Sequence, residues 1–335
     1  MSVFSTIPPD FSANEAVAIV QNHYGLTTNI CYLPSDRDQN FLCSSSEKKY
    51  VLKISNSDER KDVLEMQNKC IQFIHKSNSE LKVPLIVPGI TGSQIITIEK
   101  EEKRYFLRLV EYLSGQFLKD ILHNNSMLYQ LGAFMGHLQK IMSGFNHPAS
   151  HRDFPWDVVN TDFIKYHNKH IPNGVKIIDH FVDLFEKNVL SNDNKLRKAV
   201  IHNDGNDHNV LMNDKGNACG IIDFGDMIYS YIACEPAVCM SYVALGKEEP
   251  LEPIAQVLKG FHEKFLLTSS ELLAVIYMVC MRSCITVTMA AYRKKLFPEN
   301  NYLSVSEDQA WDFLKKMQYE DLHNWSNELV AYAES

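Results

Sequence analysis

The chain of 335 residues has 41 acidic and 33 basic residues, a formal net charge of −8, and no dense block of lysine or arginine. This charge balance argues against nucleic-acid binding, which requires clustered cations to neutralise phosphates. With 45% hydrophobic and 22% charged residues, the composition is typical of a soluble globular protein. The length allows two substantial lobes.

The N-terminal segment "MSVFSTIPPDFSANEAV" has no basic region followed by an apolar core, so we predict no signal peptide. The most apolar run, residues 272–281, ends at Arg282 and is too short to span a bilayer. We therefore expect a cytoplasmic protein without a membrane partner. The eight cysteines form no C-x-x-C pair, which favours buried free thiols over disulfides or a structural zinc site.

The first predicted helix begins at a capping box formed by Ser12 and Glu15, and Gly25 ends it. Two strand-like segments follow, over residues 30–43 and 48–55. Alternating residues in the second segment indicate one buried face, and the two segments are predicted to pair antiparallel.

Apolar residues at helical spacing predict a helix over residues 58–76. Residues 94–100 and 104–113 then form a predicted hairpin, and "SGQ" at 114–116 is the most plausible linker in the chain.

Beyond the linker the pattern becomes mainly helical. Long helices are predicted around residues 131–142, over 160–190 and throughout 235–335, with short strands within 198–223. We therefore predict an α+β bilobal fold of the protein-kinase type. Its small β-rich lobe covers residues 1–113 and binds nucleotide, and its larger helical lobe, 114–335, carries catalysis and substrate binding.

The segment "VIHNDGNDHNVLMNDKGNACGIIDFGD" places Asp204, Asn209 and Asp223 among short apolar runs. The strand 199–201 ends at His202, so Asp204 and Asn209 fall on a loop and Asp223 at the end of a later strand. A hairpin would hold all three side chains near one point. One carboxylate can then accept a proton from an attacking hydroxyl, while the amide and the second carboxylate hold Mg²⁺ against nucleotide phosphates.

The order H-x-D-x-x-x-x-N followed by D-F-G is the pattern of the kinase superfamily. It makes Asp204 the predicted base, with His202 beside it in the catalytic motif, and Asn209 and Asp223 the predicted metal ligands. The alternative, that these residues only form turns, does not explain the order of the two motifs.

The same pattern requires a strand lysine on the phosphates and a helix glutamate that orients it. Lys53 in "YVLKI" fits the first role. Glu65 and Glu59 compete for the second, and Glu65 is preferred because it lies a turn or more inside the helix.

The adenine is expected to meet the backbone of Glu111, Tyr112 and Leu113. The loop at 33–41, which occupies the position of a glycine-rich phosphate loop, contains no glycine. Backbone amides of this polar turn can still face the phosphates, and Arg37, Gln39 and Asn40 are candidates for additional side-chain donors.

Over nearly its full length the chain resembles the aminoglycoside phosphotransferase-like and choline-kinase-like small-molecule kinases. The segments "LPSDRDQNF…YVLKISN", "LEMQNKCIQFI", "RDFPWDVVN", "IHNDGNDHNVLM" and "IIDFGDMIYSY" look most like the hydroxylysine kinase family. The resemblance implies transfer of the γ-phosphate of ATP or GTP, with Mg²⁺, to the hydroxyl of 5-hydroxylysine. It also implies that Lys53 and Glu65 form the phosphate clamp.

Only nine residues separate Gly225 from Glu235. That leaves little room for the regulatory segment that follows D-F-G in protein kinases, and favours a small-molecule acceptor. Homoserine, choline, ethanolamine, methylthioribose and aminoglycosides are alternative acceptors for the same machinery. A nucleotide-binding pseudokinase is a further alternative, although Lys53, Asp204, Asn209 and Asp223 are all present.

An acceptor with ammonium groups requires anionic or aromatic partners. The candidates are Trp156, Asp157, Asp226 and Glu235. Trp156 could equally be a core aromatic, and Glu235 could instead favour the positive end of the helix that Pro236 begins. Arg152 and Arg282 are candidate partners for a carboxylate, and Arg282 interrupts an apolar helix, which usually means a specific buried partner.

Overall fold

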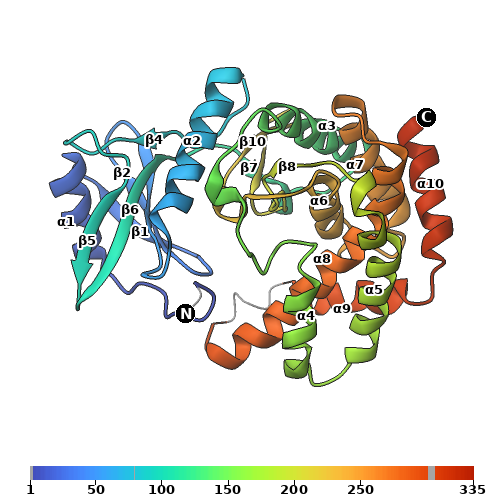
Figure 1. Ribbon diagram of the computed structural model, residues 1–335. Helices are drawn as coiled ribbons and strands as arrows, with labels where there is room; N and C mark the ends of the chain where they lie inside the picture. The colour runs from blue at the N-terminus through green and yellow to red at the C-terminus, as the bar shows by residue number, and fades with distance from the viewer. Residues whose placement is uncertain (1–2, 79, 301–305) are drawn as a thin grey trace. The chain divides into compact units, whose positions relative to one another are not determined.

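The computed structural model describes residues 3–78, 80–300 and 306–335, and the chain divides into two compact units. Unit 1 comprises residues 1–76 and 82–114, and unit 2 comprises 77–81 and 115–335 (Figure 1). The division falls one residue beyond the predicted boundary. The short segment 77–81, which begins at the last residue of the second helix, belongs to unit 2.

Unit 1 is a six-stranded antiparallel sheet with strand order β1-β2-β3-β6-β4, and β5 pairs with β6. Two helices accompany the sheet. In chain order the elements are α1 (Ala13–Tyr24), β1 (Asn29–Leu33), β2 (Gln39–Ser44), β3 (Lys49–Ile54), α2 (Lys61–Ser77), β4 (Ile86–Val87), β5 (Ile96–Lys100) and β6 (Lys103–Glu111).

The pleat of this sheet separates an apolar face from a polar one. Phe41, Leu52 and Leu109 are opposite one another on β2, β3 and β6, and they form one core with residues of α1. The neighbouring row, Asn40, Lys53 and Arg108, must point to the other face because side chains alternate along a strand. Helix α2 packs on that second face.

Unit 2 is mainly helical and contains two small sheets, with orders β10-β9-β7 and β11-β8. Its strands are β7 (Gln116–Phe117), β8 (Lys198–Ile201), β9 (Val210–Met212), β10 (Ala218–Ile221) and β11 (Ile228–Tyr231). Its α-helices are α3 (Asn125–Met142), α4 (Thr161–His167), α5 (Val175–Asn188), α6 (Cys234–Ala244), α7 (Leu251–Lys264), α8 (Ser269–Leu296), α9 (Glu307–Met317) and α10 (Leu322–Glu334). Short 3-10 turns include η1 (Leu118–Asp120) and η5 (Phe224–Asp226).

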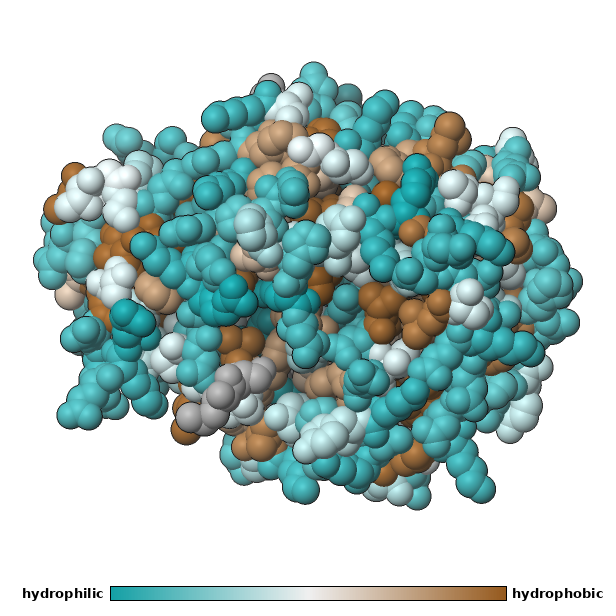
Figure 2. Space-filling model, viewed as in Figure 1, coloured by the Kyte–Doolittle hydropathy of each residue, from teal (hydrophilic) through white to brown (hydrophobic). Residues whose placement is uncertain are grey.

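Helix α8 is the central helix of unit 2. It begins at a capping box of Thr268 and Glu271, and it packs against α5, α6, α9 and α10. It is the one helix of the described residues that is long and apolar enough to cross a membrane, but 89% of its most apolar window is buried inside the protein. The face shown in Figure 2 is predominantly hydrophilic, with apolar residues in small separate groups. The apolar surface of α8 therefore belongs to the protein core.

The predicted α+β fold, with a β-rich N-terminal part and a helical C-terminal part, is confirmed. Helix 58–76 is observed as 61–77. Strands β7 and β11 were not predicted. Within the predicted helical region 235–335, residues 301–305 lie outside the described residues.

Candidate active site

The predicted catalytic loop connects β8 to β9 and is fixed by a buried asparagine. Asn203 adopts a left-handed conformation with φ 64°, which is uncommon for a residue with a side chain. Its amide nitrogen donates to the backbone oxygens of Trp156 at 3.2 Å and Asp226 at 3.3 Å. These bonds join the loop to two other segments and hold the chain in the turn that presents Asp204.

Asp204 and Asn209 are brought together as predicted. Asn209 Nδ2 donates to Asp204 Oδ2 at 2.6 Å and to the Asp204 backbone oxygen at 3.0 Å. Asn206 Nδ2 donates to the other carboxylate oxygen, Oδ1, at 2.8 Å. Because the amide nitrogen of Asn209 faces Asp204, its amide oxygen is left for another ligand.

Asp223 begins the turn that follows β10. It is also left-handed, with φ 62°, and its Oδ1 accepts from Gly225 N–H at 3.1 Å. Arg152 holds the same turn from outside, because its Nη2 donates to the backbone oxygens of Gly225 at 2.7 Å and Met227 at 2.9 Å. Such unusual backbone conformations persist where the surroundings fix them, and they cluster at functional sites. Arg152, a candidate for a substrate carboxylate, instead supports the turn.

Arg282, at the middle of α8, is the buried partner of Asp204. Its Nη2 lies 3.1 Å from Asp204 Oδ1, and the residue is only 1% exposed. The guanidinium also lies 4.5 Å from the centre of the Trp156 ring and donates to the Trp156 backbone oxygen. The buried partner expected for Arg282 is therefore the Asp204 carboxylate. A substrate carboxylate is not needed to explain its burial.

Opposing charges act on Asp204. Burial raises the pKa of Asp204 well above its usual range, the nearby Asp226 and Asp223 carboxylates raise it further, and Arg282 lowers it. The predicted base must be ionised to accept a proton, and Arg282 and the hydrogen bond from Asn206 both favour that ionised form.

His202 is fully buried and contacts the catalytic loop and the turn that follows β10. Its Nδ1 accepts from Asp204 N–H at 3.3 Å, and its ring meets Phe224 edge-on at 4.7 Å. Burial lowers the pKa of His202 to about 4, so the ring is neutral at pH 7. The prediction that His202 is catalytic is therefore corrected, because a buried, neutral ring that packs against the loop has a positioning role.

Glu235 also supports the catalytic loop. Its Oε2 accepts from the backbone N–H groups of His202 at 2.6 Å and Asn203 at 3.1 Å, and the residue is 0% exposed. The predicted contact between Glu235 and substrate is corrected, since its carboxylate is enclosed and bound to backbone. The alternative position is observed, because Glu235 lies in the first turn of α6, and its carboxylate also reaches the loop.

Two further substrate candidates are bound within the protein. The Trp156 ring stacks on Arg282, so its cation partner is internal. Asp157 Oδ1 accepts from the Ser230 hydroxyl at 2.7 Å and from Val159 N–H at 3.2 Å. Neither side chain is placed for the predicted ammonium contact. Asp226 differs, because its charge acts on Asp204, and its contact with substrate stays a prediction.

The residues present fit a magnesium ion. Among the described residues, no group of three or more His, Cys, Asp and Glu side chains could hold a metal alone. Mg²⁺, however, is usually held by one or two protein oxygens together with water and substrate phosphates. The Asn209 amide oxygen and the Asp223 carboxylate are such a pair, so they are the residues that would hold it.

In unit 1, Lys53 and the predicted Glu65 both lie on the side of the sheet that α2 covers. Arg108, which faces Lys53 across β3 and β6, donates to Gln67 at 2.8 Å and Asn68 at 3.1 Å on α2. Glu65 is three residues before Asn68 and thus on a neighbouring part of the same helix face. Its carboxylate lies 3.8 Å from Lys61 Nζ.

The β1–β2 loop is held by side chains in place of glycine turns. Asn56 is fully buried, its backbone N–H donates to Asp38 Oδ1 at 3.0 Å, and its side chain donates to the Arg37 backbone oxygen at 3.3 Å. Gln39 is engaged by the backbone of Phe11 through two bonds of 2.7 and 2.9 Å, so it is not the phosphate donor considered from sequence. Asn40 shares the Lys53 face.

The segment predicted to meet adenine is partly paired. Glu111 N–H donates to the Leu85 oxygen at 2.8 Å, and Tyr112 N–H donates to the Lys49 oxygen at 3.0 Å. In the part of the chain that the structure describes, the backbone oxygens of residues 111–113 and the Leu113 N–H therefore remain to bind a nucleotide base.

Sequence reasoning missed several supporting residues. Asn203 lies inside the H-x-D motif, and its only signal in the sequence was its residue type, because asparagine adopts the left-handed conformation more readily than most residues. Arg108 gave no signal, because its role depends on a helix that is distant in sequence.

The site has the arrangement of a kinase. The Asp204 carboxylate lies beside the Asn209 amide, and the Asp223 carboxylate follows the next hairpin. An antiparallel sheet, with a helix on the face that carries Lys53, precedes them in the chain. The segment after Gly225 is too short for the regulatory segment of protein kinases, which places the chain among kinases of small molecules.

The chain belongs to the phosphotransferase enzyme family, which residues 29–272 match. It is 30% identical to bovine (Bos taurus) hydroxylysine kinase, over 92% of this chain and 90% of that protein. It is 28% identical to hydroxylysine kinase from Xenopus laevis, over 96% of this chain and 92% of that protein. The chain is thus a phosphotransferase of the small-molecule kinase class.

Solved structures share the fold. An amicoumacin kinase in complex with AMP-PNP, Ca²⁺ and Ami superposes with a TM-score of 0.73 at 15% identity, covering 94% of this chain and 97% of that one. A microcompartment-associated aminopropanol kinase superposes with a TM-score of 0.71 at 15% identity, covering 96% and 99%.

Proposed function

We propose that this kinase phosphorylates the hydroxyl of 5-hydroxylysine, with ATP or GTP as donor and Mg²⁺ as metal. The observation that carries the proposal is the 30% identity to bovine hydroxylysine kinase over 92% of the chain. The Asp204–Asn209 pair and the Asp223 turn supply the chemistry that such a reaction requires.

In the proposed reaction, the acceptor hydroxyl oxygen attacks the γ-phosphorus while its proton passes to an oxygen of Asp204. The bond between the γ-phosphorus and the β–γ bridging oxygen breaks, and the nucleoside diphosphate leaves with that oxygen. Asn209 and Asn206 hold the Asp204 carboxylate in one orientation, and Arg282 keeps it ionised before the proton arrives. Afterwards the proton returns to solvent.

Asn209 and Asp223 are assigned to the metal, which when bound would neutralise charge on the β- and γ-phosphate oxygens. With one oxygen from each residue, the remaining coordination positions of the metal would be available to water and to the nucleotide phosphates.

Lys53 is assigned to the nucleotide phosphates and Glu65 to its orientation, because both residues belong to the covered face of the sheet. Asn40, opposite Lys53 on β2, is assigned to the same ligand. The backbone of 111–113 is assigned to the base.

A second candidate acceptor is an amino alcohol. The observation that favours it is the structural likeness to an aminopropanol kinase, with a TM-score of 0.71. Homoserine, choline, ethanolamine and aminoglycosides would use the same base and metal ligands. A pseudokinase would bind nucleotide without transferring phosphate.

A nucleotide-consumption screen tests these assignments. Purified protein with Mg²⁺ and either ATP or GTP is offered 5-hydroxylysine, homoserine, choline, ethanolamine, 1-amino-2-propanol or an aminoglycoside. Turnover that is highest with 5-hydroxylysine supports the proposal. Efficient turnover of another acceptor instead would reassign the substrate, and nucleotide binding without any turnover would favour the pseudokinase.

A further inference from the structure

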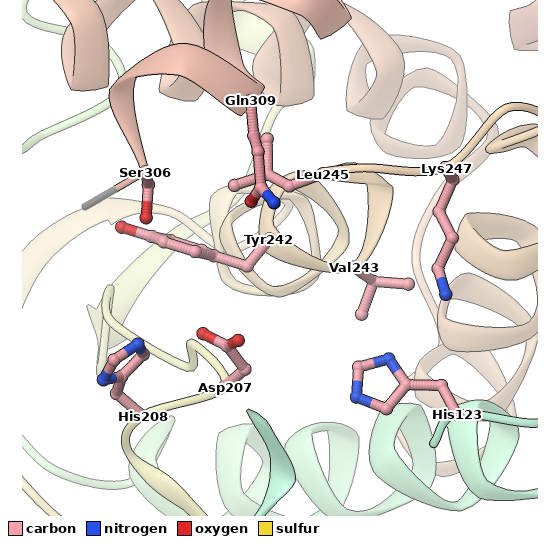
Figure 3. A pocket seen from close by; sticks show the side chains of 9 residues that line it. All are labelled: His123, Asp207, His208, Tyr242, Val243, Leu245, Lys247, Ser306 and Gln309. Carbon is pink, nitrogen blue, oxygen red and sulfur yellow. The ribbon is translucent and has the colours of Figure 1, made fainter. Parts of the chain in front are cut away.

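A polar cavity of about 210 Å³ lies within unit 2, between the catalytic loop and the ends of α6 and α9. Figure 3 shows Asp207 and His208 from the catalytic loop near the Tyr242 ring, with Lys247 and His123 at the other end of the cavity. Gln309 lies above Tyr242. Since ligand pockets for drug-sized molecules usually have about 300–1,000 Å³, this volume suits a smaller, metabolite-sized group.

The cavity presents two opposite charges that are free for a ligand. Within the described residues, neither the Asp207 carboxylate nor the Lys247 ammonium takes part in a hydrogen bond or ion pair. Lys247 is exposed and Asp207 is half-buried. Separate, unpaired charges of opposite sign along one small cavity fit a zwitterion, because each end of the ligand then meets its complementary charge.

The cavity is adjacent to the catalytic carboxylate. Tyr242, which lines the cavity, lies with its hydroxyl 3.4 Å from Arg282 Nη2, and the same nitrogen lies 3.1 Å from Asp204 Oδ1. Asp207 is three residues after Asp204 in the same loop. A ligand with a hydroxyl several carbons from its charged end could therefore reach Asp204 while that end occupies the cavity.

We propose that this cavity binds the α-amino-acid end of the acceptor, with Asp207 on the ammonium group and Lys247 on the carboxylate. The inference rests on the proposed function, since it assumes an amino-acid acceptor. It replaces Trp156, Asp157 and Glu235, whose side chains are bound internally, with two residues that were not predicted to contact substrate. Neither residue touches the reacting hydroxyl, so both determine binding and specificity.

The test compares two acceptors that differ only in the carboxylate, 5-hydroxylysine and 1,5-diaminopentan-2-ol. Asp207→Asn is expected to raise KM for both acceptors about tenfold or more, which corresponds to the loss of one charged contact. Lys247→Met is expected to raise KM for 5-hydroxylysine by a similar factor and to leave KM for the diamine unchanged. The value of kcat and the KM for nucleotide should stay within about threefold of wild type in both variants.

Asp214→Asn and Lys215→Met are matched controls, since both residues are exposed on the β9–β10 turn. They should behave as wild type. Calorimetric binding of 5-hydroxylysine, which needs no turnover, is measured on the same proteins. Weaker binding in Asp207→Asn and Lys247→Met alone supports the cavity assignment, even if wild type transfers no phosphate to that acceptor and the proposed function fails. Unchanged binding and KM in both variants would overturn the cavity assignment while leaving the proposed function intact.

Discussion

Two buried charges act on Asp204 with opposite sign, and this makes the pKa of the proposed base sensitive to its neighbours. Arg282 lowers the pKa of Asp204, whereas Asp226 raises it. Arg282→Gln should therefore move the acidic limb of the kcat–pH profile to higher pH, because Asp204 then ionises later. Asp226→Asn should move that limb to lower pH. Arg282→Lys keeps the positive charge and is the control, in which the acidic limb should stay close to its wild-type position.

Substitution of the proposed base and substitution of the proposed metal ligand should have different kinetic effects. Asp204→Asn is expected to lower kcat by about 10²–10⁴-fold, because no carboxylate is left to accept the proton. Asp223→Asn should instead raise the Mg²⁺ concentration needed for half-maximal rate, and removal of Mg²⁺ with EDTA should stop turnover of wild type. Steady-state rates over a Mg²⁺ titration separate the two. Near-normal kcat in Asp204→Asn at saturating nucleotide would contradict its assignment as base.

At the scale of single residues, motif spacing predicted contacts that are local in sequence. The Asp204–Asn209 contact follows from five positions along one loop. The partners of Trp156, Asp157 and Glu235 were not predictable in this way, because each depends on a residue brought from a distant element. An acidic or aromatic residue near a motif can serve the loop as readily as the substrate.

Helix α6 supports the catalytic loop through one titratable group. Burial raises the pKa of Glu235 from 4.5 to about 7, so the folded protein holds a proton that the unfolded chain would release. The resulting stabilisation is fully present below about pH 4.5 and is lost as the pH rises through about 7. Glu235→Gln, which cannot ionise, should therefore be more destabilising relative to wild type at about pH 5 than at about pH 8.

Thermal midpoints of both proteins at the two pH values check this expectation. Glu248→Gln, a substitution at an exposed glutamate in the loop after α6, is the control and should show no such dependence. A difference between Glu235→Gln and wild type that does not change with pH would show that the carboxylate does not titrate in this range.

Helices α3 and α7 approach so closely that two glycines are required at their contact. A Cβ at Gly132 would collide with the Val257 backbone oxygen, and one at Gly260 would collide with the Tyr129 backbone oxygen. Either residue replaced by alanine should destabilise the protein by about 1–3 kcal/mol or more, because overpacking outweighs the better helix propensity of alanine. Gln130→Ala, at an exposed position of α3, is the matched control in thermal unfolding. An unchanged midpoint in Gly132→Ala would mean that the helices can separate at no cost.

The long helices and paired strands were predictable because each repeats a periodic pattern over many residues. The Ser12–Glu15 capping box and the Gly25 stop are observed at the first helix. Strands β7 and β11, of two and four residues, are too short to show a period and form through pairing with β9 and β8. Asp223 was predicted on a strand but leaves β10 in a left-handed turn, which its neighbours impose.

At the scale of the whole molecule, the proposed nucleotide contacts belong to unit 1 and the proposed metal ligands belong to unit 2. Mg²⁺ with a non-hydrolysable nucleotide at about 100 times its Kd should stabilise wild type by about 2.7 kcal/mol. Lys53→Met and Asp223→Asn should each reduce the rise in thermal midpoint that Mg²⁺ with the nucleotide produces. Lys48→Met, on an exposed residue just before β3, should retain it. Full stabilisation of Lys53→Met would remove that residue from the nucleotide site.

The overall class of the molecule could be predicted because the two motifs and the change from strand to helix patterns agree with one another. Acceptor recognition could not, because Asp207, Tyr242 and Lys247 come from a loop, a helix and a connecting turn that share no sequence pattern. Only the fold brings them to one cavity.

The distribution of thiols gives the protein a practical handle. Six of the eight cysteines are buried, Cys219 is half-buried, and Cys31 on β1 is exposed. Burial raises the pKa of buried thiols, to about 11 for Cys43, so they react slowly. With Cys219 replaced by serine, a maleimide dye would attach at Cys31 alone, next to the glycine-free β1–β2 loop. Nucleotide binding at that loop could then be followed by fluorescence in the otherwise unlabelled enzyme.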